Sequence, residues 1–343
     1  MGNVDGVSIL VGSHPQFALH DTGPGHPERP SRLEAVAVGI AQSGVLDAVE
    51  SFEPTPAPTA AIRAVHPGRY LQAIEERCHT GGGHIDADTI VSTDSYDALL
   101  LSAGAGLDAI ARLEEGRHRA AFLAIRPPGH HATPTRAMGF CLVNNVAVAA
   151  RSLADRGERV LVVDYDAHHG NGTQDAFYND PNVVYVSLHE YPLYPGTGAL
   201  SEIGVADGYG STINVPLPAG ATGDVYRRAV DELVAPLADR WKPTWLLISA
   251  GFDAHVRDPL TGLGLTSADY ADVTRELVRL VPEGRRILFL EGGYDLVGLR
   301  DSVAATLAAL VDVDTRPEPS TSGGPGGSTV EAAVRLRAHN GLP

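Results

Sequence analysis

The chain has 343 residues, of which 43% are hydrophobic and 20% charged, so it is long enough for one large globular α/β domain or two ordinary ones. Its net charge of −16 argues against a surface that grips nucleic-acid phosphates; it suits a cationic substrate, or serves solubility alone. The two cysteines, Cys78 and Cys141, make no disulfide framework, and nothing in the sequence reads as a signal peptide or a membrane span. We therefore expect a cytoplasmic protein without nucleic-acid or membrane partners.

The first third of the chain is predicted to contain one strand, three helices and the loops between them. A short apolar strand at Val7–Val11 leads into a loop rich in proline and glycine. A helix begins at Ser31, with Ser31 as its N-cap and Glu34 at the capping-box position. Two further helices, separated by a glycine- and aspartate-rich rim loop at Thr80–Ser95, are expected at Pro67–Cys78 and Ser95–Glu115.

From residue 120 onward, apolar runs alternate with helical patterns, and most of the apolar runs end in a polar cluster. The predicted strands are Ala120–Ile125, Val160–Val163, Val183–Leu188, Thr212–Val215, Thr244–Ser249 and Arg286–Leu290. The predicted helices are Leu142–Ala154, Thr222–Arg240, Ser267–Leu280 and Asp295–Val311. This order predicts a three-layer α/β fold: helices cover both faces of a central parallel sheet of about eight strands, and the site lies at the strands' carboxyl ends.

Residues 1–312 are predicted to form one domain, because the sequence shows no second hydrophobic core and no internal repeat. Thr315–Thr329 is rich in proline, glycine and serine, which is typical of a flexible linker. Residues 313–343 would then be a linker and a short tail, in which Val330–His339 forms either a short helix or no regular structure.

The stretch from Val160 to Gly172 is the most informative part of the sequence. An apolar run that reads as a buried parallel strand ends directly in a cluster with two aspartates and two histidines, before Gly170. Asp166 and His168 are two residues apart, so their side chains point the same way while the chain stays extended. A solvated turn would explain one or two of these polar residues, whereas a divalent metal site explains the whole cluster.

Three more strand tips carry unusual side chains: the pair His130–His131, then Asp253, and then Tyr294 after two glycines. Each of them alone could be a structural residue, but in a parallel sheet all the tips lie at one edge and can converge. Asp166, His168 and Asp253 then form a set of one histidine and two carboxylates, which is typical of a catalytic zinc with an open coordination position.

The remaining side chains at these tips indicate hydrolytic chemistry. Adjacent histidines suit general base and acid catalysis, because imidazole titrates near neutral pH. The hydroxyl of Tyr294, next to two glycines, can approach closely and donate to a developing oxyanion. Metal, histidine pair and phenol together predict hydrolysis of an amide or a similar carbonyl compound.

At this point the sequence resembles the histone deacetylase family of the arginase/deacetylase fold, which includes lysine deacetylases, class II-like bacterial deacetylases and acetylpolyamine amidohydrolases. The resemblance extends from His14 to about Leu310. It rests on the motifs Arg126–His131, Gly139–Cys141, Asn144–Asn145, Asp164–Gly172, Ser187–His189, Pro195–Gly198, Ala250–Asp253 and Glu291–Tyr294.

The resemblance implies a role for each matched residue. Asp166, His168 and Asp253 would bind zinc, His131 would be the general base and acid, and Tyr294 would bind the amide carbonyl. His130 would tune the electrostatics and help to hold the water, with the carboxylate of Asp164 behind it. The family also holds a structural potassium ion, matched here by Asp164, Asp166, His168, Ser187 and the backbone of Leu188. A second monovalent site would lie around Phe177, Asp180 and Val183.

The resemblance also places an acyl-lysine tunnel in the protein. Phe140 and Tyr194 match its aromatic walls, and Gly139 and Gly293 match positions that line it. Leu260 stands where the polyamine-selective member has a gatekeeping glutamate. This difference argues against selection of a long polycation by a glutamate at this position. Other acids, such as Asp86, Asp88 and Asp94 of the rim loop, could still attract a polycation. Arg32 resembles a basic residue near an internal exit channel.

Two further comparisons with the family concern catalysis. Asn171 stands where class I members have an aspartate behind the second histidine, so the proton affinity of His131 should be somewhat lower. Class II-like members usually carry asparagine here. Tyr294 is present, whereas weakly active class IIa members have histidine, so we expect a competent catalyst.

Several alternatives remain open. The substrate is N-acetyl-lysine or a related acyl-amine, or else an acetylpolyamine or another small acylated amine. An arginase-type reaction is disfavoured, because it would need more bridging carboxylates than the strand tips offer. A non-catalytic acyl-lysine binding module is disfavoured, because it would not need the histidine pair, the ligand set and Tyr294. The metal is zinc or iron(II). Hydroxamate inhibitors are expected to bind, and the chain could form a homo-oligomer, since family members are monomers, dimers or tetramers.

Overall fold

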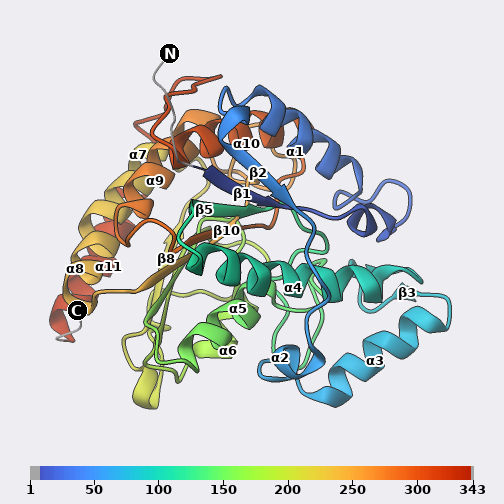
Figure 1. Ribbon diagram of the computed structural model, residues 1–343. Coiled ribbons are helices and arrows are strands. Elements are labelled where there is room, and N and C mark those ends of the chain that lie inside the picture. Colours follow the sequence, from blue (N-terminus) through green and yellow to red (C-terminus); the bar gives the residue numbers. More distant parts are fainter. Residues whose placement is uncertain (1–7, 341–343) are drawn as a thin grey trace.

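The computed structural model describes residues 8–340, and the first residue of the predicted N-terminal strand, Val7, lies outside them. Eight strands form one sheet in the order β2-β1-β5-β10-β9-β6-β7-β8, and every neighbouring pair is parallel (Figure 1). The prediction of a central parallel sheet is therefore confirmed. Its strands are β1 (Ser8–Gly12), β2 (Val49–Phe52), β5 (His118–Leu123), β6 (Val160–Asp164), β7 (Val183–Glu190), β8 (Thr212–Leu217), β9 (Trp245–Ala250) and β10 (Arg286–Leu290).

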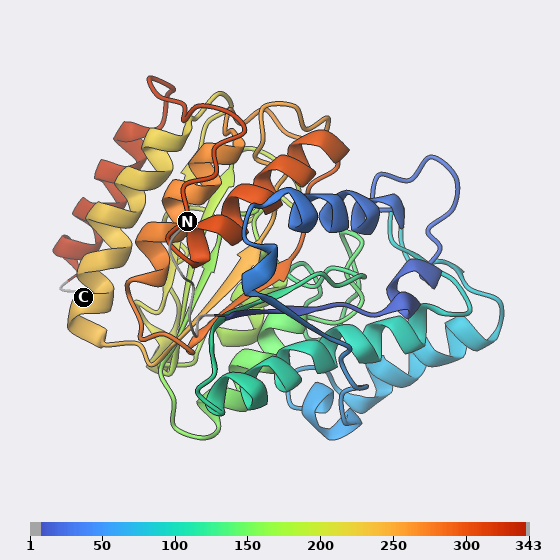
Figure 2. The same ribbon diagram turned by 45° about the horizontal axis from the view of Figure 1, so that its top comes forward.

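Helices cover both faces of the sheet, as Figures 1 and 2 show. One layer contains α1 (Ser31–Gln42), α7 (Gly223–Ala229), α8 (Ala235–Trp241), α9 (Ser267–Val278), α10 (Leu296–Leu310) and α11 (Gly327–His339). The other contains α2 (Thr59–Arg63), α3 (Gly68–His79), α4 (Ser95–Glu114), α5 (Asn145–Ala154) and α6 (Asn171–Phe177). No helix between residues 8 and 340 is long and apolar enough to cross a membrane.

The alternation of side chains along each strand builds the two cores. In β6, Leu161 and Val163 belong to the core beneath α9 and α10, whereas Val160 and Val162 belong to the core beneath α4 and α5. All five residues of β6 are buried. A strand buried on both faces must be apolar throughout, because successive side chains point to opposite sides of the sheet.

Several sequence predictions differ from the structure at the ends of elements. Strand β2 was not predicted, because its sequence Val49–Phe52 is short, carries two polar residues and lies at the sheet edge. The N-cap of α1 is Pro30 rather than Ser31, and it makes no side-chain capping bond. Helix α5 begins at Asn145, because the side chain of Asn144 accepts a hydrogen bond from Ala147 N at 2.9 Å.

The rim loop is also more regular than the sequence indicates. Within it, β3 (Gly83–His84) pairs with β4 (Ile90–Val91) as an antiparallel hairpin, whose tip is tied by Asp86 Oδ1 accepting from Thr89 N at 2.8 Å. Glycine at position 82 is required on two grounds: its φ is +77°, and a Cβ there would lie 2.3 Å from the carbonyl oxygen of Val91.

The prediction of a flexible linker at Thr315–Thr329 is wrong, because this segment is fixed to the rest of the molecule. Thr321 donates to the buried carboxylate of Asp269 through both its backbone N–H (3.0 Å) and its hydroxyl (2.7 Å). Beyond it, α11 forms a regular helix whose Val330 and Ala333 join the main core. The division into a domain of residues 1–312 and a tail of residues 313–343 stays a prediction.

Candidate active site

The predicted site residues follow four strands that are adjacent in the sheet. In spatial order these are β5, β10, β9 and β6, which lead into His130–His131, Tyr294, Asp253 and Asp166–His168 respectively. Because all four strands are parallel, their carboxyl ends meet at one edge of the sheet. Segments that are far apart in the sequence are brought together in this way.

Asp166, His168 and Asp253 form a compact set of potential metal ligands. One ligand atom from each residue lies within 4.8 Å of the other two. His168 Nδ1 lies 2.9 Å from Asp253 Oδ2 and 3.2 Å from Asp166 Oδ1, so three donor atoms face one point. Backbone N–H groups hold the carboxylates in place: that of Gly292 donates to Asp166 and that of Ala167 to Asp253, both at 2.8 Å.

Two glycines make room for these carboxylates. A Cβ at position 251 would lie 2.0 Å from Asp166 Oδ2, and one at position 292 would lie 2.2 Å from Asp253 Oδ2. Any side chain at either position would displace a ligand oxygen. The backbone just after β9 and β10 therefore leaves room for the two carboxylates. Together with His168 they form a donor set that fits Zn²⁺ or Fe²⁺.

His130 is buried and is backed by a carboxylate. Its Nδ1 donates to Asp164 Oδ2 at 3.0 Å, and the same oxygen accepts the hydroxyl of Tyr185 at 3.0 Å. Burial by itself would lower the pKa of His130, but the negative charges of Asp166 and Asp164 outweigh it and raise that pKa to about 10. Without a bound metal ion, His130 therefore carries the positive charge of the histidine pair.

His131 is in the opposite electrostatic situation. Burial, together with the nearby rings of His130 and His168, holds its pKa well below the ordinary value. Its Nδ1 lies 2.9 Å from Asn171 Oδ1, which can only accept, so the proton of the neutral ring sits on Nδ1. Nε2 is then left with a free lone pair, as a general base requires.

Tyr294 is held by its backbone and by its ring. Its N–H donates to Asp258 Oδ2 at 2.7 Å, and its ring lies beneath the guanidinium of Arg32, 5.1 Å from the ring centre. Burial raises the pKa of the hydroxyl well above its ordinary value, so the phenol remains a hydrogen-bond donor. Asp258 precedes Leu260 by two residues, and its role as the anchor of Tyr294 follows from this contact.

A cavity of about 250 Å³ leads to these groups, and its lining includes four of the five predicted tunnel residues. Gly293 does not line it, whereas Leu193, which was not predicted, does. Gly139 (φ +55°) must be glycine, because a Cβ there would lie 2.4 Å from the ring of His131. The full lining is Asp88, His131, Gly139, Phe140, His168, Leu193, Tyr194, Leu260 and Tyr294.

Two of the residues matched to the first monovalent cation site lie on neighbouring strands. Asp164 of β6 lies opposite Ser187 of β7, and the carbonyl of Leu188 accepts the hydroxyl of Tyr226 at 3.2 Å. At the second position, the Asp180 carboxylate forms an ion pair with Arg151 at 2.6 Å.

Beneath the site lies a buried ion network that includes Arg32, Arg126 and Glu28. Glu28 is fully buried between two arginines: Arg32 donates to it at 3.1 Å, and Arg126 through two nitrogens at 2.5 and 2.7 Å. Arg32 also donates to the carbonyl oxygens of Gly293 (2.7 Å) and Glu291 (2.5 Å). The network thus connects the loop before α1 to the tips of β5 and β10.

The Glu28→Gln substitution should lower the free energy of unfolding at neutral pH by about 3–5 kcal/mol, because two buried guanidinium groups lose their countercharge. Although burial opposes ionisation, Arg126 and Arg32 lower the pKa of Glu28 from 4.5 to about 2. A lowered folded-state pKa stabilises the protein above the unfolded value, and this stabilisation is lost as the pH falls toward 2. Urea unfolding of both proteins at neutral pH and at about pH 3 should therefore show a smaller difference in acid. An equal difference at both pH values would contradict this assignment.

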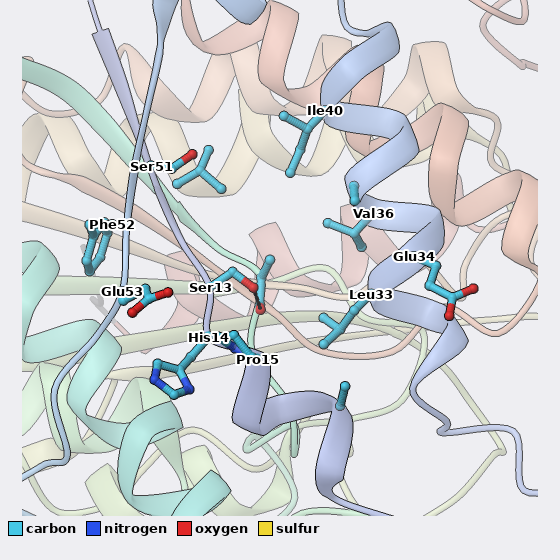
Figure 3. Close-up of a pocket in the computed structure, with 14 residues that line it drawn as sticks. Ser13, His14, Pro15, Leu33, Glu34, Val36, Ile40, Ser51, Phe52 and Glu53 are labelled. Carbon is cyan, nitrogen blue, oxygen red and sulfur yellow. Dashed lines mark hydrogen bonds between the residues drawn. The ribbon is translucent and has the colours of Figure 1, made fainter.

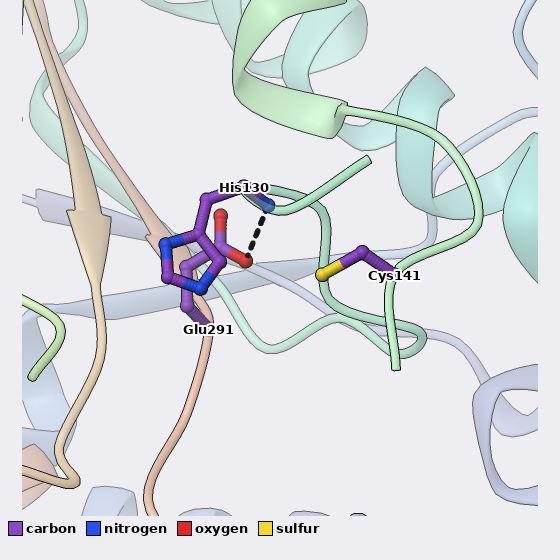
Figure 4. A group of neighbouring side chains, drawn as sticks. All are labelled: His130, Cys141 and Glu291. Atoms are coloured by element: carbon purple, nitrogen blue, oxygen red, sulfur yellow. Dashed lines mark hydrogen bonds between the residues drawn. The ribbon is translucent and has the colours of Figure 1, made fainter. Parts of the chain in front are cut away.

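A second group of metal-ligating residue types lies behind His130, namely Cys141 and Glu291 (Figure 4). Burial raises the pKa of the Cys141 thiol well above its ordinary value, so it is a poor ligand. Glu291 Oε2 instead accepts the backbone N–H groups of Gly129 (2.7 Å) and His130 (3.1 Å). Glu291 therefore holds the histidine loop, a role that follows from these two contacts.

A larger cavity of about 720 Å³ lies between β1, β2 and α1 (Figure 3). Leu33, Val36, Ile40 and Phe52 give it a mostly apolar lining, with Glu34 and Glu53 at its border. None of the predicted site residues lines it, so it is separate from the metal-ligand cluster.

Comparison with known proteins gives one consistent result. A model of the histone deacetylase domain matches residues 26–310. A probable deacetylase of Archaeoglobus fulgidus is 39% identical over 291 residues, covering 83% of this chain and 81% of that protein. Histone deacetylase 14, chloroplastic, of Arabidopsis thaliana is 38% identical, covering 87% and 76%. The crystal structure of the HDA15 HD domain superposes with a TM-score of 0.89 at 35% identity, covering 97% of this chain and 95% of that chain.

Proposed function

The chain belongs to the histone deacetylase family, and from that premise we propose that it is a zinc-dependent amidohydrolase that removes an acetyl group from a primary amine such as acetyl-lysine. The observation that carries this proposal is that His168, one of the three clustered ligand residues, lines one narrow cavity together with His131 and Tyr294. Hydrolysis would release acetate and the free amine.

Asp166, His168 and Asp253 would hold the metal, since their donor atoms share one point and two glycines leave space for their carboxylates. When bound, a divalent ion there supplies Lewis-acid polarisation of the amide carbonyl and lowers the pKa of a water molecule to about 7. The negative charge of the two carboxylates favours a cation at this point.

The protein's own side chains would then move the protons. His131 Nε2 accepts a proton from the attacking water, while Nδ1 remains hydrogen-bonded to Asn171. His130, backed by Asp164, would help to hold the water and tune the electrostatics of the site. Tyr294 donates its hydroxyl proton in a hydrogen bond to the carbonyl oxygen, and His131 finally passes its proton to the leaving amine.

The cavity favours a thin, flexible acyl-amine chain over a long polycation. Phe140, Tyr194, Leu193 and Leu260 give its wall large apolar and aromatic surfaces, so the part of the substrate that lies against them must be largely apolar. An acetyl-lysine side chain meets this requirement. The alternative, an acetylpolyamine, is favoured by the net charge of −16 and by Asp88 in the cavity wall.

The test is a comparison of rates on an acetyl-lysine peptide, acetylputrescine, acetylspermidine and longer acyl-lysines, each with Zn²⁺ or Fe²⁺ restored after chelation. We expect the acetyl-lysine peptide to give the highest kcat/KM and a hydroxamate to abolish turnover. A parent protein that cleaves none of these substrates with either metal would refute the proposal. A preference for acetylspermidine would support the alternative substrate class.

The proposal also includes a structural potassium ion, a cellular location and an oligomeric state. We propose a structural K⁺ bound by Asp164, Asp166, His168, Ser187 and the backbone of Leu188, because their strand tips adjoin one another. A cytoplasmic location and a homo-oligomeric state remain expectations.

A further inference from the structure

The segment between α10 and α11 contacts the loop that follows β9. Glu318 Oε2 lies 2.9 Å from His255 Nε2, and it also accepts the backbone N–H of Ser267 at 3.0 Å. His255 is only 1% exposed and lies two residues after Asp253, one of the potential metal ligands. A carboxylate outside the matched family domain, residues 26–310, is thus joined to the loop that begins at Asp253.

The direction of this hydrogen bond follows from the other nitrogen of the ring. His255 Nδ1 accepts the backbone N–H of Arg257 at 3.2 Å, so the proton of the neutral imidazole sits on Nε2. Nε2 therefore donates to Glu318. Helix α10 closes the third side of the ring, because a Cβ at Gly298 would lie 2.8 Å from Nδ1.

The turn that His255 supports leads to residues that contact the site. Asp258 follows it, and its carboxylate accepts the N–H of Tyr294 at 2.7 Å. Leu260 comes next and lines the cavity, and the hydroxyl of Thr261 donates back to the carbonyl of Asp253 at 2.6 Å. A displacement of His255 would therefore be transmitted both to Asp253 and, through Asp258, to Tyr294.

Glu318 is itself held rigidly. On one side, Thr266 Oγ1 donates to the carbonyl of Pro319 at 2.6 Å, and Thr321 is bound to Asp269. On the other side, the hydroxyl of Thr315 donates to the carbonyl of Ser43 at 2.8 Å. The carboxylate is thus preorganised to receive His255, which is what a supporting residue of a catalytic site requires.

We propose that Glu318 is a positioning residue: through His255 it fixes the loop from Asp253 to Leu260, so that the C-terminal segment completes the active site. The kinetic part of this proposal rests on the proposed function, whereas the structural part does not.

The experiment compares Glu318→Ala, Glu318→Gln and the parent protein by amide hydrogen exchange and by steady-state kinetics. In Glu318→Ala, peptides that cover residues 253–265 should exchange faster, and kcat should fall about 10-fold, as for loss of an outer-sphere partner. Glu318→Gln keeps an oxygen that accepts from His255 and should remain within about 2-fold of the parent, because the bond survives. The matched control is Glu331→Ala, which removes a contact of 3.0 Å between Glu331 of α11 and Arg228 of α7 and should change neither the exchange nor the kinetics.

Parental exchange over residues 253–265 in a folded Glu318→Ala variant would overturn the proposal. Equal losses in Glu318→Ala and Glu318→Gln would also overturn it, because the hydrogen bond would then not be the operative contact. If Glu318→Ala does not fold, Glu318→Asp replaces it, since the shorter side chain withdraws the carboxylate from His255. Failure of the proposed function would look different: the parent would cleave no acyl-amine, while the exchange difference between parent and variant would persist.

Discussion

Replacing Tyr294 by phenylalanine should lower kcat on the preferred acyl-amine by about 10²–10³-fold, because one donor to the developing oxyanion is lost. The ring should stay in place, since Asp258 holds the backbone of Tyr294 and Arg32 lies over the ring face. Metal content and KM should therefore remain close to those of the parent. Steady-state kinetics together with metal analysis of the purified variant measure both expectations.

The control for this prediction is Tyr209→Phe, which removes a hydroxyl from a tyrosine that is 53% exposed and does not line the cavity. It should leave kcat unchanged. If Tyr294→Phe kept near-parental rates on every acyl-amine that the parent cleaves, the role assigned to the phenol would be wrong. A loss of bound metal in Tyr294→Phe would likewise argue against a role confined to the carbonyl.

Replacing Asp253 by alanine should abolish stoichiometric metal binding and, with it, turnover. Loss of an outer-sphere partner typically costs about 10–100-fold in metal affinity, and loss of a ligand should cost more. The variant also removes the acceptor of the Ala167 N–H and the partner of His168, so the remaining ligands lose their support. Elemental analysis after dialysis, together with a chelator competition assay, measures the loss.

A suitable control is Asp301→Asn, which alters a carboxylate paired with Arg300 on α10, 2.7 Å away. It should retain metal and activity. Stoichiometric zinc in a folded Asp253→Ala protein would contradict the assignment of Asp253 as a metal ligand. Zinc loss with restored turnover on added Fe²⁺ would instead show that the altered site selects a different ion.

The central sheet was predictable because a strand buried on both faces must be apolar throughout. Val160–Asp164 satisfies this condition, and the polar residues that follow it mark the end of the strand. Strand β2 was not predictable in this way, since an edge strand needs only a few buried residues and is stabilised mainly by its pairing with β1. The prediction of a flexible linker at Thr315–Thr329 failed for a related reason. Amino-acid composition indicates only local chain preference, whereas Thr321 is bound to a buried carboxylate that is distant in the sequence, Asp269.

The candidate site residues were predictable where the residue type and its position at a strand tip together indicate a chemical role. Asp166, His168 and Asp253 are ligand types at strand tips, and their chemistry requires these residue types at these places. The supporting residues carry no such signal. Glu291, Glu28 and Glu318 are carboxylates whose importance depends on what lies opposite them.

The sequence by itself therefore determined the parallel α/β sheet, the family and the residue types at four strand tips, because burial and metal chemistry restrict which amino acids can occupy those positions. The tertiary structure alone decided which of the remaining polar groups meet. Glu28 reaches Arg126 across 98 positions of the chain, and Glu318 reaches His255 across 63. Such pairs form only when the sheet order and helix packing bring their segments together, and neither member of a pair is unusual without the other.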